Sequence, residues 1–124
     1  MRDALLVVAG GGFGSLCRYL VSGLAMRRFG DSFAWGTMSV NLIGCFAVGL
    51  LAGLVERSAL PAHLRVLAIS GFLGGFTTFS TFSLESVRMI ANGAPGKGFL
   101  NIGVNVILGL VLTLAGIALT GRRA

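Results

Sequence analysis

The sequence predicts an all-α membrane protein with four transmembrane helices, the third of them broken. The chain has 124 residues, of which 55% are hydrophobic and 11% are charged, and its mean hydropathy is +0.90. An average soluble domain has about 25% charged residues, and a soluble chain this short could not bury so much apolar surface in one core. We expect residues 1–124 to form a single transmembrane domain.

The apolar residues gather into four runs, each able to form one membrane-spanning helix. The runs cover about residues 4–26, 33–55, 64–90 and 98–120. A helix needs about 20 residues to cross the hydrocarbon core of a bilayer, so each run is long enough. Short segments rich in Gly, Pro and charged residues separate the runs, at 27–31, 56–61 and 92–97. The first run continues too far for a cleavable signal peptide, so we expect it to remain as a span.

The basic residues point to a membrane surface rather than to nucleic acid. A net charge of +6 would suggest a nucleic-acid partner in a soluble protein. Here the cations stand in short clusters between the apolar runs, which is their usual place beside a bilayer. We therefore expect a multi-pass protein of the cell inner membrane, surrounded by lipid.

The distribution of these cations predicts dual topology. An even number of spans returns the chain to its starting side, so the loops and termini divide into two sets. One face carries five cations, which are Arg2, Arg57, Arg65, Arg122 and Arg123, and the other carries four, which are Arg27, Arg28, Arg88 and Lys97. An excess of Lys and Arg normally holds one face in the cytoplasm. Near equality predicts insertion in both orientations and pairing as an antiparallel homodimer; the alternative is one orientation fixed by helix hydrophobicity or insertion order.

Glycine is unusually frequent and favours close helix packing. Among the 20 glycines are three GxxxG pairs, Gly10 with Gly14, Gly49 with Gly53, and Gly71 with Gly75. In lipid, the small surface of glycine lets helix backbones approach each other closely. We expect a tightly packed bundle, and the three pairs together favour an oligomer.

Polar side chains mark the second and fourth runs. Thr37 and Asn41 are four residues apart and therefore share one helix face. Their N–H and O–H donors could hydrogen-bond an anion, or they could join two helices of the bundle. Asn101 and Asn105 have the same spacing, and for them we expect bonding between helices.

The third run is poorly suited to an unbroken helix. Adjacent glycines at 74 and 75 precede five Ser or Thr residues within residues 77–83. Glycine permits unusual backbone angles, and hydroxyl groups can bond freed backbone groups. We predict a helix break near Gly74 to Thr78. Carbonyl groups released there could bind a small hard cation.

Phenylalanines follow the predicted break at helical spacing. Phe79 and Phe82 are three residues apart and share a face, with hydroxyls nearby at Ser80, Thr81 and Ser83. The edge of a phenyl ring is electropositive and can favour an anion without a full charge. Ordinary packing is the usual reason for such a pair, but the surrounding hydroxyls favour an anion pathway.

Two charged residues lie within the runs. Arg18 and Glu85 are both expected near the face that carries Arg88. They could pair with each other, or Arg18 could attract anions while Glu85 pairs with Arg88. Arg18 could also extend to the membrane surface. Cys17 and Cys45 match no metal spacing and are expected to pack as small hydrophobes.

These residues resemble the CrcB/Fluc family of fluoride channels over essentially the full chain. The resemblance rests on the glycine segment 10–14 before Arg18, the segments 36–44 and 71–83, Glu85, and Asn105. It implies an antiparallel, dual-topology homodimer with two parallel fluoride pathways. It also implies a sodium ion at the dimer centre, held by the backbone carbonyls of Gly74 and Thr77 from each subunit.

The resemblance also implies residues of the fluoride pathway. Phe79 and Phe82 match the family's phenylalanine pair and Asn41 its pore asparagine. Thr37, Ser80 and Thr81 match the hydroxyl-lined track, and Arg18 matches an arginine near the aqueous vestibule. The chain departs from the family at Gly109, where a serine is common, so either water or another group replaces the hydroxyl, or the track is shorter on that side.

The activity implied is passive export of fluoride, which gives resistance to fluoride toxicity. No nucleophile–base pair or phosphate-binding loop is visible in the sequence, so we do not expect an enzyme. A four-span multidrug transporter is one rival, but it needs a buried acid in its first span, where only Asp3 stands at the edge. A structural subunit of a membrane complex is the other, and it would leave the polar residues of the second and third runs unexplained.

Overall fold

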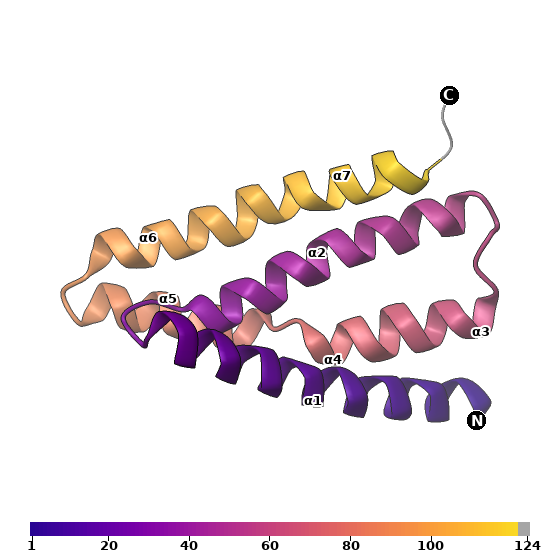
Figure 1. Ribbon diagram of the computed structural model, residues 1–124, viewed down its shortest axis with the longest axis horizontal. Helices are drawn as coiled ribbons and strands as arrows, with labels where there is room; N and C mark the ends of the chain where they lie inside the picture. The colour runs from indigo at the N-terminus through magenta and orange to yellow at the C-terminus, as the bar shows by residue number, and fades with distance from the viewer. Residues whose placement is uncertain (122–124) are drawn as a thin grey trace.

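The computed structural model describes residues 1–121, and within that range every regular element is helical (Figure 1). Helix α1 covers Arg2–Phe29 and α2 covers Trp35–Glu56. The third span contains α3 (Ala62–Arg65), the π-helical η1 (Val66–Leu73), α4 (Gly74–Phe76) and α5 (Phe79–Ala91). The fourth contains α6 (Pro95–Gly103), the π-helical η2 (Val104–Leu108) and α7 (Gly109–Thr120). The four-span, all-helical prediction is confirmed. Most span ends extend one to three residues beyond the predicted ones, whereas α2 begins two residues later than predicted and the fourth span ends at residue 120 as predicted.

The third span changes partner halfway along its length (Figure 1). Its first half, η1 and α4, packs against α1, whereas α5 packs against α6. The C-terminal half of α2 packs against α7, and α2 also contacts α1. The point where the third span passes from one neighbour to the other is therefore the centre of the bundle.

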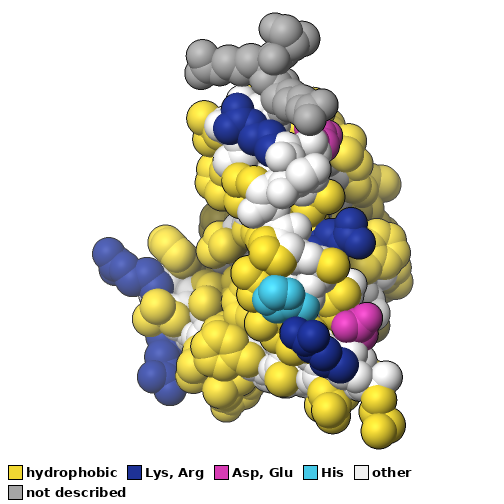
Figure 2. Space-filling model, turned by 90° about the vertical axis from the view of Figure 1, so that its right-hand side faces the viewer, with side chains coloured by type: hydrophobic (Ala, Val, Ile, Leu, Met, Phe, Trp, Pro, Cys, Tyr) yellow, Lys and Arg dark blue, Asp and Glu magenta, His cyan; other side chains and the backbone are white. Residues whose placement is uncertain are grey.

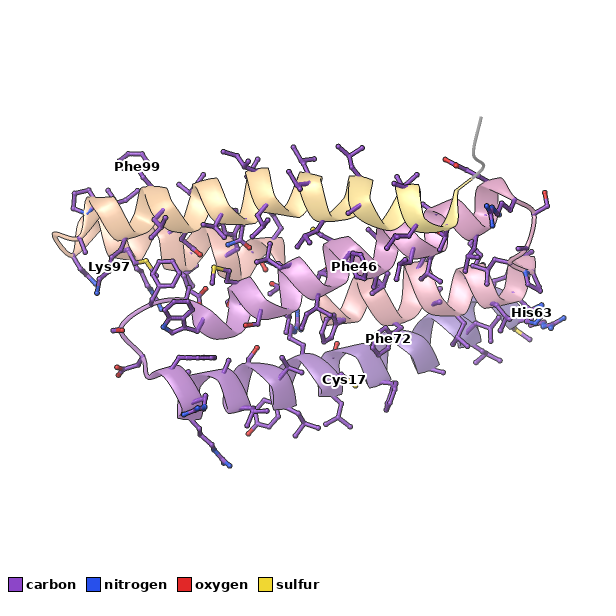
Figure 3. The ribbon with its side chains drawn as sticks, turned by 45° about the horizontal axis from the view of Figure 1, so that its top comes forward. Cys17, Phe46, His63, Phe72, Lys97 and Phe99 are labelled. Atoms are coloured by element: carbon purple, nitrogen blue, oxygen red, sulfur yellow. The ribbon has the colours of Figure 1, made fainter. Side chains whose placement is uncertain are left out.

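The two ends of the bundle carry the charged side chains. Figure 2 shows one end, where cationic side chains and a histidine lie among apolar ones. Figure 3 places His63 and Lys97 at opposite ends of the bundle. Arg57 Nε donates to the Gly121 carbonyl at 3.1 Å, and Lys97 Nζ donates to the Ser32 carbonyl at 2.9 Å. The predicted grouping of loops is therefore confirmed for the described cations; Arg122 and Arg123 lie outside the described residues.

The surface between these ends is apolar, while the buried interior is small. The core cluster consists of Val40, Leu73 and Phe76, with Cys17 among the side chains packed against it. Large hydrophobic residues are exposed along the helices, and Leu114 is 67% exposed. Phe99 likewise points away from the bundle (Figure 3). Exposing so large an apolar surface to water would be unfavourable, and each of the four helical spans is long enough to cross a bilayer. The chain is therefore a multi-pass membrane protein.

The three GxxxG pairs serve packing within the chain. A methyl group on Gly14 would overlap the Phe72 carbonyl oxygen, and one on Gly75 would overlap the Gly11 carbonyl oxygen. Gly49 is held equally close to the Thr113 backbone of α7. The expected tight bundle is confirmed. The glycine pairs give no support to an oligomer, because the third span and α7 of the same chain already occupy their faces.

We predict that Gly14→Ala destabilises the bundle, because the new methyl group forces α1 away from the third span. Overpacking of this kind costs about 1–3 kcal/mol. The measurement is size-exclusion chromatography of detergent-purified protein after heating. The quantity compared is the temperature at which half of the monodisperse peak is lost. Gly12→Ala is the matched control, since a methyl group there meets nothing within 4 Å. Equal midpoints for the two variants would contradict the assigned contact.

Candidate functional site

The third span is interrupted at two threonines. Thr77 has φ −85° and ψ 160°, and Thr78 has φ −150° and ψ 116°, so both are extended. The predicted break is confirmed, but the expectation that glycines would form it is wrong. Gly74 and Gly75 remain helical within α4. Gly75 is needed instead for the close approach to Gly11 of α1.

Asn41 of α2 replaces the helix hydrogen bonds lost at the break. In a continuous helix the Thr78 amide would donate to the Gly74 carbonyl. Here it donates to Asn41 Oδ1 at 2.8 Å, and Asn41 Nδ2 returns a bond to the Thr78 carbonyl at 3.0 Å. Thr78 Oγ1 accepts from the Thr81 amide at 3.3 Å and so caps α5. One side chain from a neighbouring helix thus satisfies both backbone groups of Thr78.

Two side chains of α1 lie against backbone carbonyls at the break. Arg18 Nη1 donates to the Thr77 carbonyl at 3.3 Å, and Ser15 Oγ lies 3.5 Å from the Gly75 carbonyl. Among residues 1–121 no ion pair joins Glu85 to Arg18 or to Arg88, so neither predicted pairing is present. Glu85 Oε2 is buried there without a hydrogen-bond partner.

A chain of hydrogen bonds continues from Asn41 to the fourth span. Asn41 Nδ2 donates to Asn105 Oδ1 at 3.1 Å. Asn105 Nδ2 donates to the Asn101 carbonyl at 2.9 Å and to Asn101 Oδ1 at 3.0 Å. Asn101 Nδ2 donates to Ser86 Oγ at 2.9 Å, and Ser86 Oγ donates to the Phe82 carbonyl at 2.8 Å. The expected bonding of Asn101 and Asn105 between helices is confirmed.

A cavity of about 410 Å³ lies beside the break. Several of the predicted site residues line it, namely Asn41, Gly74, Thr77, Phe79 and Phe82, and Thr78 and Asn105 join them. The cavity also touches both π-helical segments, through Ile69 and Leu73 of η1 and through Asn105 and Val106 of η2. The wall therefore combines amide groups, backbone carbonyls and phenyl rings.

The two predicted phenylalanines have different surroundings. Their ring centroids are 5.4 Å apart with an interplanar angle of 54°. Phe82 is 6% exposed, whereas Phe79 is 77% exposed. Only Phe82 is therefore enclosed by this chain, and Phe79 extends from it.

The remaining predicted residues lie outside this cavity. Thr37 is buried and lines a second cavity of about 370 Å³, near residues 30–34, together with Glu85, Arg88 and Lys97. Ser80 and Thr81 are exposed on α5. Arg18 is half-buried at the break. The structure thus places Asn41, Gly74, Thr77 and the two phenylalanines around one cavity. It leaves the hydroxyl groups of Ser80 and Thr81 on the surface of α5.

Gly109 is a close-packing position. A methyl group there would lie 3.1 Å from Cys45 Sγ on α2. Thr113, one turn later, already donates to the carbonyls of Cys45 and Gly109, at 3.0 Å in each case. The cysteine therefore occupies the space beside Gly109, and Thr113 supplies no free hydroxyl in its place.

Sequence reasoning missed three parts of the site. Thr78 was not identified as the partner of Asn41, and Ser86 was not considered. Asn101 was expected only to join helices, yet it is fully buried at 0% exposure in the middle of the hydrogen-bond chain. The spacing of Asn101 and Asn105 on one helix face was a usable signal, because two amides one turn apart can bond each other.

Comparison with known proteins yields consistent matches over nearly the whole chain. Residues 5–117 match the family described as CrcB-like protein, Camphor Resistance (CrcB). A relative from Maridesulfovibrio salexigens is 50% identical over 120 residues, which are 96% of this chain and 95% of the relative. A Rhizobium etli relative is 45% identical over 96% of each chain, and a Geobacter relative is 46% identical over 94% of this chain and 95% of its own. All three bear the name fluoride-specific ion channel FluC.

Proposed function

This chain belongs to the CrcB-like family, and we propose that it is a fluoride-selective channel that lets the ion leave the cytoplasm passively. Relatives at 45–50% identity over nearly the full chain carry the name of such a channel. The observation that carries the proposal is the cavity at the helix break, where Asn41 and the rings of Phe79 and Phe82 meet. Such export would protect a cell from fluoride toxicity.

The chemistry of this cavity suits a small anion. Stripping water from a small ion is costly unless other donors replace the lost hydrogen bonds. One N–H of Asn41 would bond the anion in place of Asn105 Oδ1, and phenyl rims offer weak positive potential. Conduction also requires that the ion can leave again. Among the described residues that line this cavity none is Lys or Arg, so no fixed charge would trap the anion.

The two cavities suggest the course of the pathway. Asn41 and Phe82 line the central cavity, while Thr37 and Glu85 line the outer one. Thr37 is one turn from Asn41 on α2, and Glu85 is one turn from Phe82 on α5. The pathway we propose therefore follows the groove between α2 and α5. Arg88 and Lys97 at its outer end would raise the local concentration of anions.

The surface of α5 supports a dimer. Ser80 and Thr81 are exposed on the described chain, next to the break, and Phe79 is 77% exposed. Polar groups at membrane depth are costly against lipid and usually face protein or a water-filled cavity. We propose that a second copy covers this face and completes the hydroxyl-lined track. The near balance of cations at the two ends favours an antiparallel pair.

The carbonyls at the break fit a structural sodium ion. The Thr78 amide donates to Asn41 and thereby leaves the Gly74 carbonyl without its usual helical donor. The Thr77 carbonyl also faces away from the helix ladder and accepts only the 3.3 Å bond from Arg18 among the bonds found for residues 1–121. Neutral oxygens are suitable ligands for a hard cation. A bound sodium would add positive potential beside the anion pathway and would join two subunits.

Fluoride efflux from liposomes tests the proposed function. We expect the wild-type protein to release trapped fluoride rapidly without a proton gradient, as measured with a fluoride electrode. Phe79→Ile removes a ring edge, and Asn41→Asp replaces N–H donors by a carboxylate. Loss of a hydrogen bond to a charged group costs about 1.5–3 kcal/mol, so Asn41→Asp should slow efflux by about tenfold or more. Phe79→Ile should also slow efflux, because the electropositive ring edge is lost.

Thr120→Val is the matched control for efflux. It removes a 2.7 Å bond between α7 and the Leu50 carbonyl of α2, away from both cavities, so its rate should match that of the wild type. Wild-type protein that leaves vesicles sealed would contradict the channel. Unchanged rates in both site variants would contradict the site assignment alone. Transport only with a proton gradient would favour the multidrug-transporter alternative.

Single-cysteine labelling tests dual topology. In a chain with Cys17 and Cys45 replaced by alanine, His63→Cys and Gly96→Cys place one thiol at each end of the bundle. If the positive-inside bias is balanced, roughly half of either variant should react with an impermeant maleimide in intact cells. Complete labelling of one variant and none of the other would show a single orientation.

A further inference from the structure

Asn101 bonds Asn105, one of the two amide side chains beside the break, although it does not line the cavity. An asparagine side chain presents N–H donors on one side and an oxygen on the other, and the two orientations have nearly the same shape. For an anion they are opposites, because one attracts it and the other repels it. Both Asn41 and Asn105 line the central cavity. Thr78 already fixes Asn41, because its amide bonds Asn41 Oδ1 and its carbonyl accepts from Asn41 Nδ2, so the question is what fixes Asn105.

The geometry of the hydrogen bonds shows what fixes Asn105. Its Nδ2 donates to two oxygens of Asn101, the main-chain carbonyl at 2.9 Å and Oδ1 at 3.0 Å. A flipped Asn105 would place its own oxygen against these two acceptors. It would also turn an N–H toward Asn41 Nδ2, which now donates to Asn105 Oδ1 at 3.1 Å. The flip would thus replace three hydrogen bonds by repulsive contacts.

Asn101 is held in turn from α5. Its Nδ2 donates to Ser86 Oγ at 2.9 Å, and the single hydrogen of that hydroxyl is committed to the Phe82 carbonyl at 2.8 Å. Asn101 is 0% exposed and Ser86 is 2% exposed, so water cannot substitute for either partner. Every donor in the chain therefore points the same way, from the break toward α5.

We infer that Asn101, supported by Ser86, is a positioning residue that sets the polarity of the anion site. This inference deepens the proposed channel function. By holding Asn105 with its oxygen toward Asn41, Asn101 gives the second N–H of Asn41 an acceptor rather than a facing N–H group. The pairing of Asn41 with Thr78 is needed to satisfy the break. The bond to Asn105 is therefore the one that an arriving anion would take over.

The test uses Asn101→Leu, which keeps the branched shape but removes the side-chain acceptor and donor. We expect fluoride efflux to fall by about tenfold or more, since Asn105 loses its bond to Asn101 Oδ1 and its orientation is held less firmly. The side-chain amide signals of Asn41 and Asn105 in ¹⁵N–¹H spectra of the detergent-solubilised protein should shift or broaden. Ser86→Ala, a smaller change, should move the same signals and lower efflux less. It keeps the inference testable if Asn101→Leu fails to fold.

Thr120→Val is again the control, because it also removes a hydrogen bond between helices but lies outside the chain of amides. It should leave both the efflux rate and the Asn41 and Asn105 signals unchanged. Efflux of Asn101→Leu within twofold of the wild type, or unshifted amide signals in Asn101→Leu and Ser86→Ala, would overturn the inference. The spectra do not depend on conduction, so this result is separate from failure of the channel function itself.

Discussion

Every backbone polar group within a membrane needs a hydrogen-bond partner, and the exchange between Thr78 and Asn41 meets this requirement at the centre of the bundle. An unsatisfied group in hydrocarbon costs several kcal/mol. A broken helix at this depth therefore exists only if neighbouring helices supply the missing bonds. Asn41 supplies two of them, through Oδ1 to the Thr78 amide and through Nδ2 to the Thr78 carbonyl. The carbonyl of Gly74 loses its helical donor in return.

The rest of the fold positions helices around this exchange. Glycines let α1 approach η1 and α4 so closely that Arg18 reaches the Thr77 carbonyl. Beyond the break, α5 passes to the fourth span, where the amide chain reaches Ser86. The break thus divides the third span into a half fixed by backbone packing and a half fixed by polar contacts. The cavity lies where the two halves meet, so its wall contains carbonyls, amides and rings together.

Sequence patterns predicted the spans, the grouping of the loops and the existence of the break. The length of an apolar run and the polar residues within it are both visible in a short stretch of sequence, so these features needed no knowledge of distant contacts. They did not predict which residues form the break. In a membrane helix, glycine can either permit an unusual backbone conformation or let a neighbouring helix approach closely. The sequence alone does not show which of these applies at Gly74 and Gly75. The partner of Thr78 lies 37 residues away, so no local spacing reveals it. Local spacing likewise could not separate buried Phe82 from exposed Phe79, because that difference depends on which side of α5 faces the rest of the bundle.

The central claim is that the Thr78 amide bonds the Asn41 side chain instead of the Gly74 carbonyl. Scalar coupling across hydrogen bonds measures this directly in isotope-labelled, detergent-solubilised protein. The structure predicts a correlation between the Thr78 amide nitrogen and the side-chain carbonyl carbon of Asn41. A correlation to the backbone carbonyl carbon of Gly74 would instead show a continuous helix, and it would remove the basis for the cavity and its amide chain.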